Sequence, residues 1–230
     1  MIKVLSYPVK SGDPGWPENP TFQFEQYTST ERGDVANQYM LHLFNHFGSH
    51  MDGPNHFNPN GIKLYEVPVE KFVYQHPLLL DVQKGPEELV NVSDLAPIQS
   101  ELASADLILF RSHFSRHRES DPDLYAAHGP GISSELSKYF IENCPNLKAV
   151  GMDWMSLAAY QHQEDGFLSH QYMLGNFHDR YILIIEDLNL EGLEASDVQT
   201  VVALPLRVHG VDSGPCTAIA IAAKFDRALS

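Results

Sequence analysis

The sequence has few of the features that mark secreted, membrane-spanning or nucleic-acid-binding proteins. It holds only two cysteines, Cys144 and Cys216, which lie far apart and outside any CxxC pattern. We therefore expect buried or inert thiols rather than a disulfide framework. Fifteen basic against thirty acidic side chains give a formal charge of −15, which would repel nucleic acid and anionic membranes. We expect neither as a partner.

Long apolar runs are also absent. No stretch of the sequence approaches the roughly twenty apolar residues that cross a bilayer. The apolar part of the N-terminal segment is too short for a signal peptide. A cytoplasmic location is the resulting expectation. At 230 residues with 43% hydrophobic content, the chain can bury a sizeable core, and we expect residues 1–230 to form a single domain.

Several short apolar or β-branched runs, bounded by polar or turn residues, predict buried strands. They are residues 2–5, 38–44, 78–82, 107–111, 149–152, 181–186 and 201–204. Two segments with helical spacing of apolar residues, 93–102 and 133–143, each begin near a capping serine and predict helices. The pattern indicates an α/β fold with too few helices for regular alternation.

Residues 7–34 are rich in Pro, Gly, Ser, Thr and charged residues. This composition predicts an ordered surface arm or loop rather than a helix. Trp16 in this segment is expected to line a pocket or a subunit contact, or to pin the segment to the core.

The densest group of metal-competent side chains is His46, His50, Asp52 and His56, which are evenly spaced within eleven positions. Imidazole and carboxylate together suit zinc, manganese or iron. Side chains on a strand alternate between its faces, so His46, His50 and Asp52 would point the same way if the stretch is extended. The Gly-Pro pair that follows argues against a helix and for a turn. The stretch predicts a metal site.

The residues next to this stretch give weaker indications of function. His42 continues the even spacing, but we do not expect it to be a ligand. Ser49 lies on the opposite strand face and is expected to support or pack rather than to attack a substrate. The sequence has no G-x-S-x-G elbow and no glycine-rich phosphate loop. Serine hydrolase and nucleotide chemistry are therefore disfavoured.

The stretch His46-x-Gly-Ser-His50-x-Asp52-x-Pro-x-His56 resembles the signature of the cyclase family of metal-dependent hydrolases. That family includes bacterial kynurenine formamidases, isatin hydrolases and cyclic imide hydrolases. The resemblance implies a swivelling β/β/α fold, with mixed sheets and a few packed helices. It also implies a homo-oligomer, a dimer or tetramer, whose pockets receive residues from a neighbour.

A second resemblance lies downstream, where His170 precedes a Leu-Gly pair and Glu186 ends an apolar run. These two residues are further apart than is usual in the family, and residues 177–180 look like an insertion between them. His162 and His178 are the alternatives to His170. The segment 204–215 also resembles the family.

The resemblance implies a ligand set for one or two divalent ions, with zinc and manganese the most expected. Asp52 would bridge a first ion, held with His46 and His50, to a second ion held by His170 and Glu186. His56 would remain as the general base and acid. The alternative for His56 is a further ligand or a donor behind the ligands.

The activity that the resemblance implies is hydrolysis of a C–N amide bond in a small molecule by metal-activated water. The substrate would be an arylformamide such as N-formylkynurenine, or a cyclic amide or imide such as isatin. Thr217 stands where family members commonly carry Arg. Together with the 177–180 insertion, it leaves open a non-hydrolytic cyclase, dehydratase or carbonyl-binding relative. A spare His56 disfavours a purely structural metal site.

Overall fold

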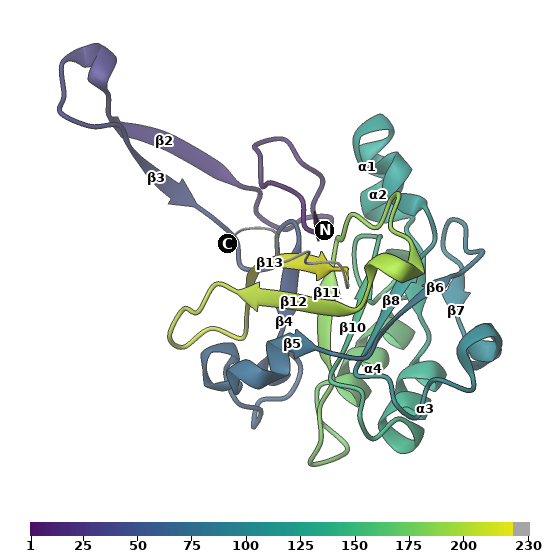
Figure 1. Cartoon of the computed structure of the whole chain (residues 1–230). Coiled ribbons are helices and arrows are strands. Elements are labelled where there is room, and N and C mark those ends of the chain that lie inside the picture. Colours follow the sequence, from purple (N-terminus) through teal and green to yellow (C-terminus); the bar gives the residue numbers. More distant parts are fainter. Residues whose placement is uncertain (223–230) are drawn as a thin grey trace, which may run out of the picture.

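The centre of the protein is one mixed nine-stranded sheet, seen in a computed structural model that describes residues 1–222. Its strand order is β5-β12-β13-β4-β11-β10-β8-β6, and β1 pairs with β13 (Figure 1). The strands are β1 (Ile2–Val4), β4 (His50–Asp52), β5 (Val73–Tyr74), β6 (Pro77–Asp81), β8 (Leu107–Arg111), β10 (Ala149–Met152), β11 (Leu183–Glu186), β12 (Thr200–Pro205) and β13 (Ser213–Ile221).

Strand β4 joins two differently built halves of this sheet. On one side β6, β8, β10 and β11 run parallel. On the other side β13, β12 and β5 pair antiparallel. Strand β4 is antiparallel to both neighbours and pairs His50 with Glu186 of β11 and Asp52 with Ser213 of β13. The sheet order therefore places the histidine-rich stretch between the ends of two distant strands.

The parallel strands are apolar on both faces, as expected when both faces are covered. Ile108, Phe110 and Val150 face a core shared with the helices. Leu107 and Leu109 face a second core shared with the antiparallel strands. Because side chains alternate along each strand, its residues pack by turns into two separate cores.

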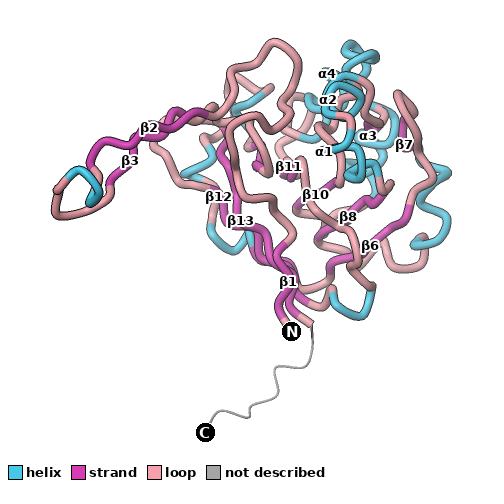
Figure 2. Tube along the Cα trace, turned by 90° about the horizontal axis from the view of Figure 1, so that it is seen from above, coloured by secondary structure: helices cyan, strands magenta, loops and turns pink. Residues whose placement is uncertain are grey.

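The helices lie beside the parallel strands (Figures 1 and 2). They are α1 (His117–Ser120), α2 (Pro122–Ala127), α3 (Ser134–Asn143) and α4 (Gln163–Met173). Helix α3 begins as predicted, with the Ser133 hydroxyl accepting from the backbone N–H of Leu136. Short 3₁₀ turns lie at Thr30–Arg32, Pro54–His56, Leu64–Glu66, Val69–Phe72, Val92–Ile98, Phe114–Arg116, Tyr160–His162 and Ala195–Asp197.

Helix α4 was not predicted, because the residues that it buries form no apolar stripe. They are Gly166, Ser169, His170 and Met173. A Cβ at Gly166 would lie 2.3 Å from the Cβ of Ala158, so glycine is required for this close approach. Ser169 shares a 2.6 Å hydroxyl hydrogen bond with Ser137 of α3. Small and polar contacts thus replace the usual hydrophobic face.

A hairpin projects from this body, formed by β2 (Gln23–Thr28) and β3 (Gln38–His42) (Figures 1 and 2). The arm expected at residues 7–34 is present, although its strand β2 was not predicted. The strand expected at 38–44 ends at His42 and does not run into the histidine-rich stretch. A smaller pair, β7 (Leu89–Val90) and β9 (Gly131–Ile132), is parallel.

The predicted fold class, α/β with mixed sheets and a few packed helices, is confirmed. The other predicted strands and the helix at 133–143 are present to within a residue or two. The helix predicted at 93–102 is present in part, as a 3₁₀ helix over Val92–Ile98 with Pro97 inside it. Proline lacks the N–H that an α-helix needs there. Among the described residues no helix has the length and apolar character that a bilayer crossing requires.

Candidate metal centre

Strand β4 carries the centre of the candidate site. His50, Met51 and Asp52 are all buried. Met51 faces the second core, whereas His50 and Asp52 line a pocket on the other face. This alternation was predicted from the spacing. The even spacing has no structural meaning for His46, however, because that residue precedes the strand.

His46 reaches the site from a loop rather than from a strand face. The chain between β3 and β4 turns at Gly48, which has a left-handed φ of +66°, a conformation that glycine adopts without strain. The turn brings the His46 ring to 5.3 Å from that of His50 and 4.0 Å from that of His56, measured between centroids. The expectation of one extended stretch was wrong, although its residues do meet.

The downstream half of the site comes from α4 and β11. His170 lies in the last full turn of α4, and Glu186 ends β11. The two alternatives to His170 lie elsewhere: His162 and His178 are exposed, and His178 lines a different depression. Thr217 is exposed and lines a third depression, away from the candidate centre. The residue in place of the family arginine therefore does not face these ligands.

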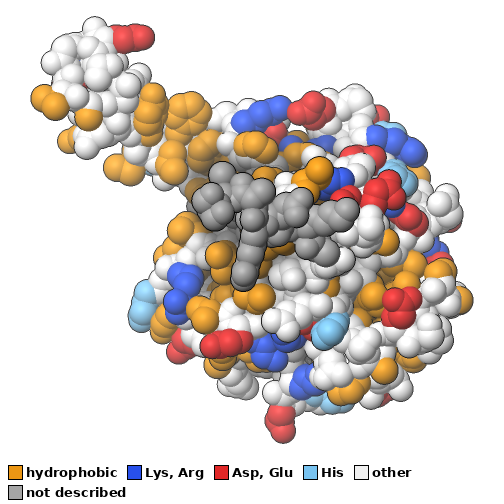
Figure 3. Space-filling model, in the orientation of Figure 1, with side chains coloured by type: hydrophobic (Ala, Val, Ile, Leu, Met, Phe, Trp, Pro, Cys, Tyr) orange, Lys and Arg blue, Asp and Glu red, His pale blue; other side chains and the backbone are white. Residues whose placement is uncertain are grey.

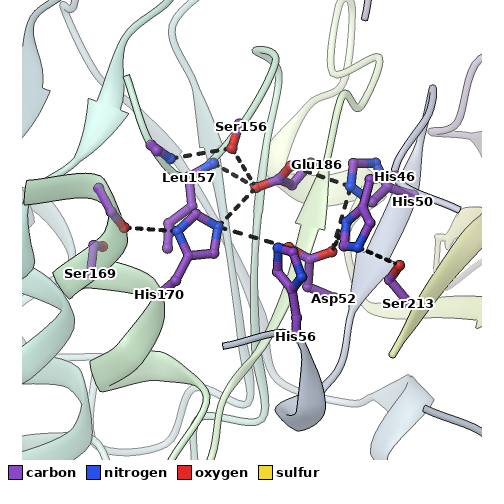
Figure 4. Close-up of polar contacts among 12 residues, drawn as sticks. His46, His50, Asp52, His56, Ser156, Leu157, Ser169, His170, Glu186 and Ser213 are labelled. Carbon is purple, nitrogen blue, oxygen red and sulfur yellow. Dashed lines mark hydrogen bonds and ion pairs between the residues drawn. The ribbon is translucent and has the colours of Figure 1, made fainter. Parts of the chain in front are cut away.

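Asp52 lies at the middle of the group (Figure 4). Its Oδ1 is 3.5 Å from Nε2 of His50. Its Oδ2 is 3.8 Å from Nε2 of His170 and 3.9 Å from Nε2 of His56. Glu186 closes the group from the other side, 3.4 Å from Nε2 of His50 and 3.7 Å from Nε2 of His170. Residues from four segments thus converge on one point.

The far side of each group is tied to the protein. Nδ1 of His50 lies 2.8 Å from the carbonyl oxygen of Gly48, and Nδ1 of His170 lies 2.8 Å from that of Gly166. A carbonyl accepts only, so each Nδ1 donates and each neutral ring turns a bare Nε2 towards Asp52. Glu186 Oε1 accepts from the Ser156 hydroxyl at 3.0 Å and the Leu157 N–H at 2.7 Å. Such outer partners are typical of metal-binding side chains.

The inner side of the group is left without hydrogen bonds. Within residues 1–222, His50 Nε2 and both carboxylate oxygens of Asp52 are buried and have no hydrogen-bond partner. His46 Nδ1 lies 2.9 Å from Asp52 Oδ1, as an ion-pair contact. Burying such atoms unpaired costs about 1–3 kcal/mol each. Converging lone pairs of imidazole and carboxylate fit a divalent cation.

Among residues 1–222 there are two sets of three residues whose ligand atoms lie within 4.8 Å of one another in each set, and Asp52 belongs to both. One set adds His46 and His56, and the other adds His50 and Glu186. A shared Asp52 agrees with the bridging role that the family resemblance implied. The grouping of His56 with His46 agrees with the alternative in which His56 is a ligand. The assignment of each ligand stays a prediction.

The electrostatics of the group favour positive charge. Burial by itself would lower the pKa of His46, but the carboxylates of Asp52 and Asp212 outweigh it and raise this pKa to about 10. Burial likewise opposes ionisation of Asp52, yet the surrounding histidines hold its pKa well below its usual range. Glu186 has the corresponding effect on His170, raising its pKa against the effect of burial. A bound cation would be stabilised by the same field.

Asp212 is part of this network, and the sequence analysis gave it no role. Its Oδ2 lies 2.9 Å from Nε2 of His46 and 3.0 Å from Nδ1 of His56. The only signal in the sequence was the family-like segment 204–215. Asp212 follows His56 by 156 positions, so no local spacing could have connected them.

The group lies at the base of a pocket of about 260 Å³. Its apolar wall is formed by Trp16, Phe44, Phe57, Met155, Ala158 and Phe167, and Asn19 and Ser156 are polar members of the lining. Trp16 therefore lines a pocket, one of the roles expected of it. Its ring meets Tyr160 edge-on, with 5.2 Å between centroids. A mostly apolar pocket with a polar base is the usual form of a small-molecule site.

Comparisons with known proteins identify the relatives of this chain. The family model "Putative cyclase" matches residues 4–159. An uncharacterized protein from Haemophilus influenzae is 36% identical over 108 residues, which are 47% of this chain and 76% of that protein. A kynurenine formamidase from Bacillus thuringiensis subsp. konkukian is 24% identical over 221 residues, 94% of each chain.

The fold is that of solved relatives. Isatin hydrolase A from Labrenzia aggregata, bound to benzyl benzoate, superposes with a TM-score of 0.80 at 22% identity, over 96% of this chain and 93% of that one. This likeness confirms the fold that the resemblance implied. The family model covers more than half of the sequence, and the chain therefore belongs to the cyclase family of metal-dependent hydrolases.

Proposed function

We propose that the protein hydrolyses a C–N amide bond of a small molecule with the help of a divalent metal held around Asp52. The observation that carries this proposal is the set of unpaired lone pairs on His50 and Asp52 at the base of the pocket. Family membership and the kynurenine formamidase and isatin hydrolase relatives support it.

The ligands we propose are those that the sequence suggested. His46, His50 and Asp52 would hold one ion, and His170 and Glu186 would hold a second, bridged by Asp52. The set contains no thiolate, so zinc or manganese suits it better than soft, thiolate-bound metals. If only one ion is bound, some of these five side chains would be its ligands, and the others would support the ligands from behind.

A divalent cation held here would lower the pKa of water and polarise a substrate carbonyl. We propose that His56 moves the proton, because Asp212 holds its Nδ1 and leaves its Nε2 to face the centre. That nitrogen would accept a proton from the attacking water and return it to the leaving amide nitrogen. Ser156 and the Leu157 N–H keep Glu186 in place meanwhile.

The substrate we propose is an aromatic amide. The rings of Trp16, Phe44, Phe57 and Phe167 line the pocket and offer flat apolar surfaces to a planar ring. An arylformamide such as N-formylkynurenine and a cyclic amide such as isatin both place a carbonyl beside such a ring. The names of the relatives point to these two classes.

We also propose that the protein is a homo-oligomer, a dimer or tetramer. The hairpin β2–β3 exposes Phe24, Tyr39, Met40 and Leu41, each by more than half, and Figure 3 shows apolar side chains along it. Exposed apolar surface of this kind marks interaction sites. Light scattering on the wild type and on a Phe24→Asp/Leu41→Asp variant tests this. A wild type that is monomeric at micromolar concentration would contradict it.

The metal and the reaction are tested together. Metal content by elemental analysis, and turnover of N-formylkynurenine and isatin, are measured on the wild type, on His50→Ala and on His178→Ala. We expect His50→Ala to lose both metal and turnover and the exposed His178→Ala to keep both. Wild type that binds metal but cleaves neither amide would favour a non-hydrolytic relative. Metal-supplemented wild type that binds none would refute the proposal.

A further inference from the structure

We propose that Asp212 is a positioning residue that orients His46 and His56 together and fixes which nitrogen of each faces the metal centre. The observation is a single oxygen, Asp212 Oδ2, that lies 2.9 Å from His46 Nε2 and 3.0 Å from His56 Nδ1. This inference rests on the proposed function, because it concerns how the same centre is held in working order.

Asp212 is itself held through both its side chain and its backbone. Its Oδ1 accepts from the side-chain amide of Asn45 at 3.0 Å. Its backbone carbonyl accepts from the N–H of Gly53 at 2.9 Å, and a Cβ at Gly53 would come within 2.8 Å of that carbonyl oxygen. The end of β4 is therefore fastened to the start of β13 at this residue. The backbone that carries this carboxylate is therefore fixed by the sheet, and its Oδ1 by Asn45.

A carboxylate oxygen accepts hydrogen bonds, so each imidazole must donate to it, and a ring whose other nitrogen faces a bound cation keeps this proton alone. His46 then carries its proton on Nε2 and His56 on Nδ1. The opposite nitrogens, His46 Nδ1 and His56 Nε2, become acceptors that lie 2.9 Å and 3.9 Å from the two oxygens of Asp52. The two rings lie between an inner and an outer carboxylate, with centroids 4.0 Å apart. One residue thus sets the tautomer of both.

Ser213 offers a comparison within the same site. Its hydroxyl lies 2.8 Å from His46 Nε2, and no bond from it to His56 is seen among residues 1–222. Removing this hydroxyl should loosen one ring, whereas removing the Asp212 charge should loosen both. A carboxylate that acts outside the site gives the second control: Asp165 accepts from the N–H and hydroxyl of Ser134 and holds α4 to the start of α3.

The test compares Asp212→Asn, Ser213→Ala and Asp165→Asn with the wild type. Zinc affinity is measured by competition with a chromogenic chelator, and kcat and KM are measured on whichever amide the wild type cleaves. We expect zinc affinity of Asp212→Asn to fall about 10- to 100-fold, and kcat to fall with little change in KM. Ser213→Ala should lose less on both counts, and Asp165→Asn should bind zinc like the wild type.

Nitrogen-15 spectra of the zinc-loaded proteins add a readout that stability alone would not move. His56 should be protonated on Nδ1 in the wild type and should populate both tautomers in Asp212→Asn. Asp212→Ser replaces Asp212→Asn if the latter does not fold. A folded variant with zinc affinity within twofold of the wild type and an unchanged tautomer would overturn the inference alone. Wild type that binds neither zinc nor manganese would overturn the proposed function and the inference with it.

Discussion

Two buried polar clusters meet at the end of β11, and neighbouring residues belong to different ones. Glu186 turns towards the metal centre. Asp187, with a left-handed φ of +53°, turns to the opposite side and pairs with Arg118. There the guanidinium donates to both oxygens of Asp187 at 2.9 Å, and the Tyr125 hydroxyl donates at 2.6 Å. Asp13 approaches the same guanidinium at 3.4 Å.

Each cluster has buried charged groups at its centre, but only the Arg118 cluster is complete without a ligand. In the Arg118 cluster the cation is part of the chain, and burial, which alone would lower the pKa of Arg118, is outweighed by Asp187, which raises it. In the metal centre, three buried acceptor atoms of His50 and Asp52 have no donor within the described chain. The lesson is that a buried cluster complete in itself holds the fold, whereas one with converging unpaired acceptors is built for a ligand.

The largest expected effect comes from removing the shared carboxylate of the metal centre. Asp52→Asn takes away the charge common to both ligand sets, so turnover should fall about 10³-fold or more, since metal chemistry supplies several kcal/mol. Wild type should gain about 2.7 kcal/mol of stability from metal at a hundredfold excess over its Kd. Asp52→Asn should unfold at the same temperature with and without metal. Equal stabilisation of both proteins by metal would contradict this prediction.

Breaking the Arg118 cluster should lower stability and leave metal binding unchanged. Arg118→Met leaves Asp187 buried without its cation and should lower the free energy of unfolding by about 3–5 kcal/mol, measured by urea titration. Zinc bound per folded molecule should stay close to wild type. The double variant Arg118→Met/Asp187→Asn removes both charges and should recover part of the loss. Loss of zinc from folded Arg118→Met would show that the two clusters are not independent.

A smaller effect on zinc affinity is expected from removing a hydrogen-bond donor to Glu186. Ser156→Ala removes one of two donors to Oε1 and leaves the Leu157 N–H, so zinc affinity should fall about tenfold, the low end for such outer partners. Ser112→Ala is the matched control, because its hydroxyl donates at 2.9 Å to the buried carboxylate of Asp153, outside the ligand set. Chelator competition should show a loss in the first variant and none in the second.

The smallest effect is expected at the Arg111–Asp81 pair, which resembles the Arg118–Asp187 pair but lies at the surface. Arg111 donates to both oxygens of Asp81, whose side chain is 52% exposed. This hydrogen bonding lowers the pKa of Asp81, so the pair stabilises the fold above the unfolded-state pKa of about 4 and loses that effect as pH falls through the lower folded value. Asp81→Asn should cost less than about 1 kcal/mol at pH 7. The difference from wild type should vanish in acid, as urea titrations at several pH values would show.

Local sequence was informative where a pattern depends on neighbours alone. The apolar runs of β8 and β10 and the Ser133 cap of α3 were predicted correctly, because alternation and capping act over a few residues. Helix α4 was not predicted, because Gly166 and Ser169 pack through close backbone approach and a hydroxyl hydrogen bond. Such contacts leave no periodic pattern of apolar residues in the sequence. The spacing at 93–102 predicted a helix but not its type, which is a 3₁₀ helix that contains Pro97.

The sequence by itself determined that His50 and Asp52 share one face of a strand and that metal-competent side chains cluster around them. It also supplied Glu186 at the end of an apolar strand. Only the tertiary structure decided that β4 lies between β11 and β13, pairing residues that are more than 130 positions apart. That order brings Glu186, His170 and Asp212 to the same point and sends Asp187 to Arg118. Side-chain direction is encoded locally by backbone periodicity, whereas the meeting of distant strands depends on how the whole sheet buries its two cores.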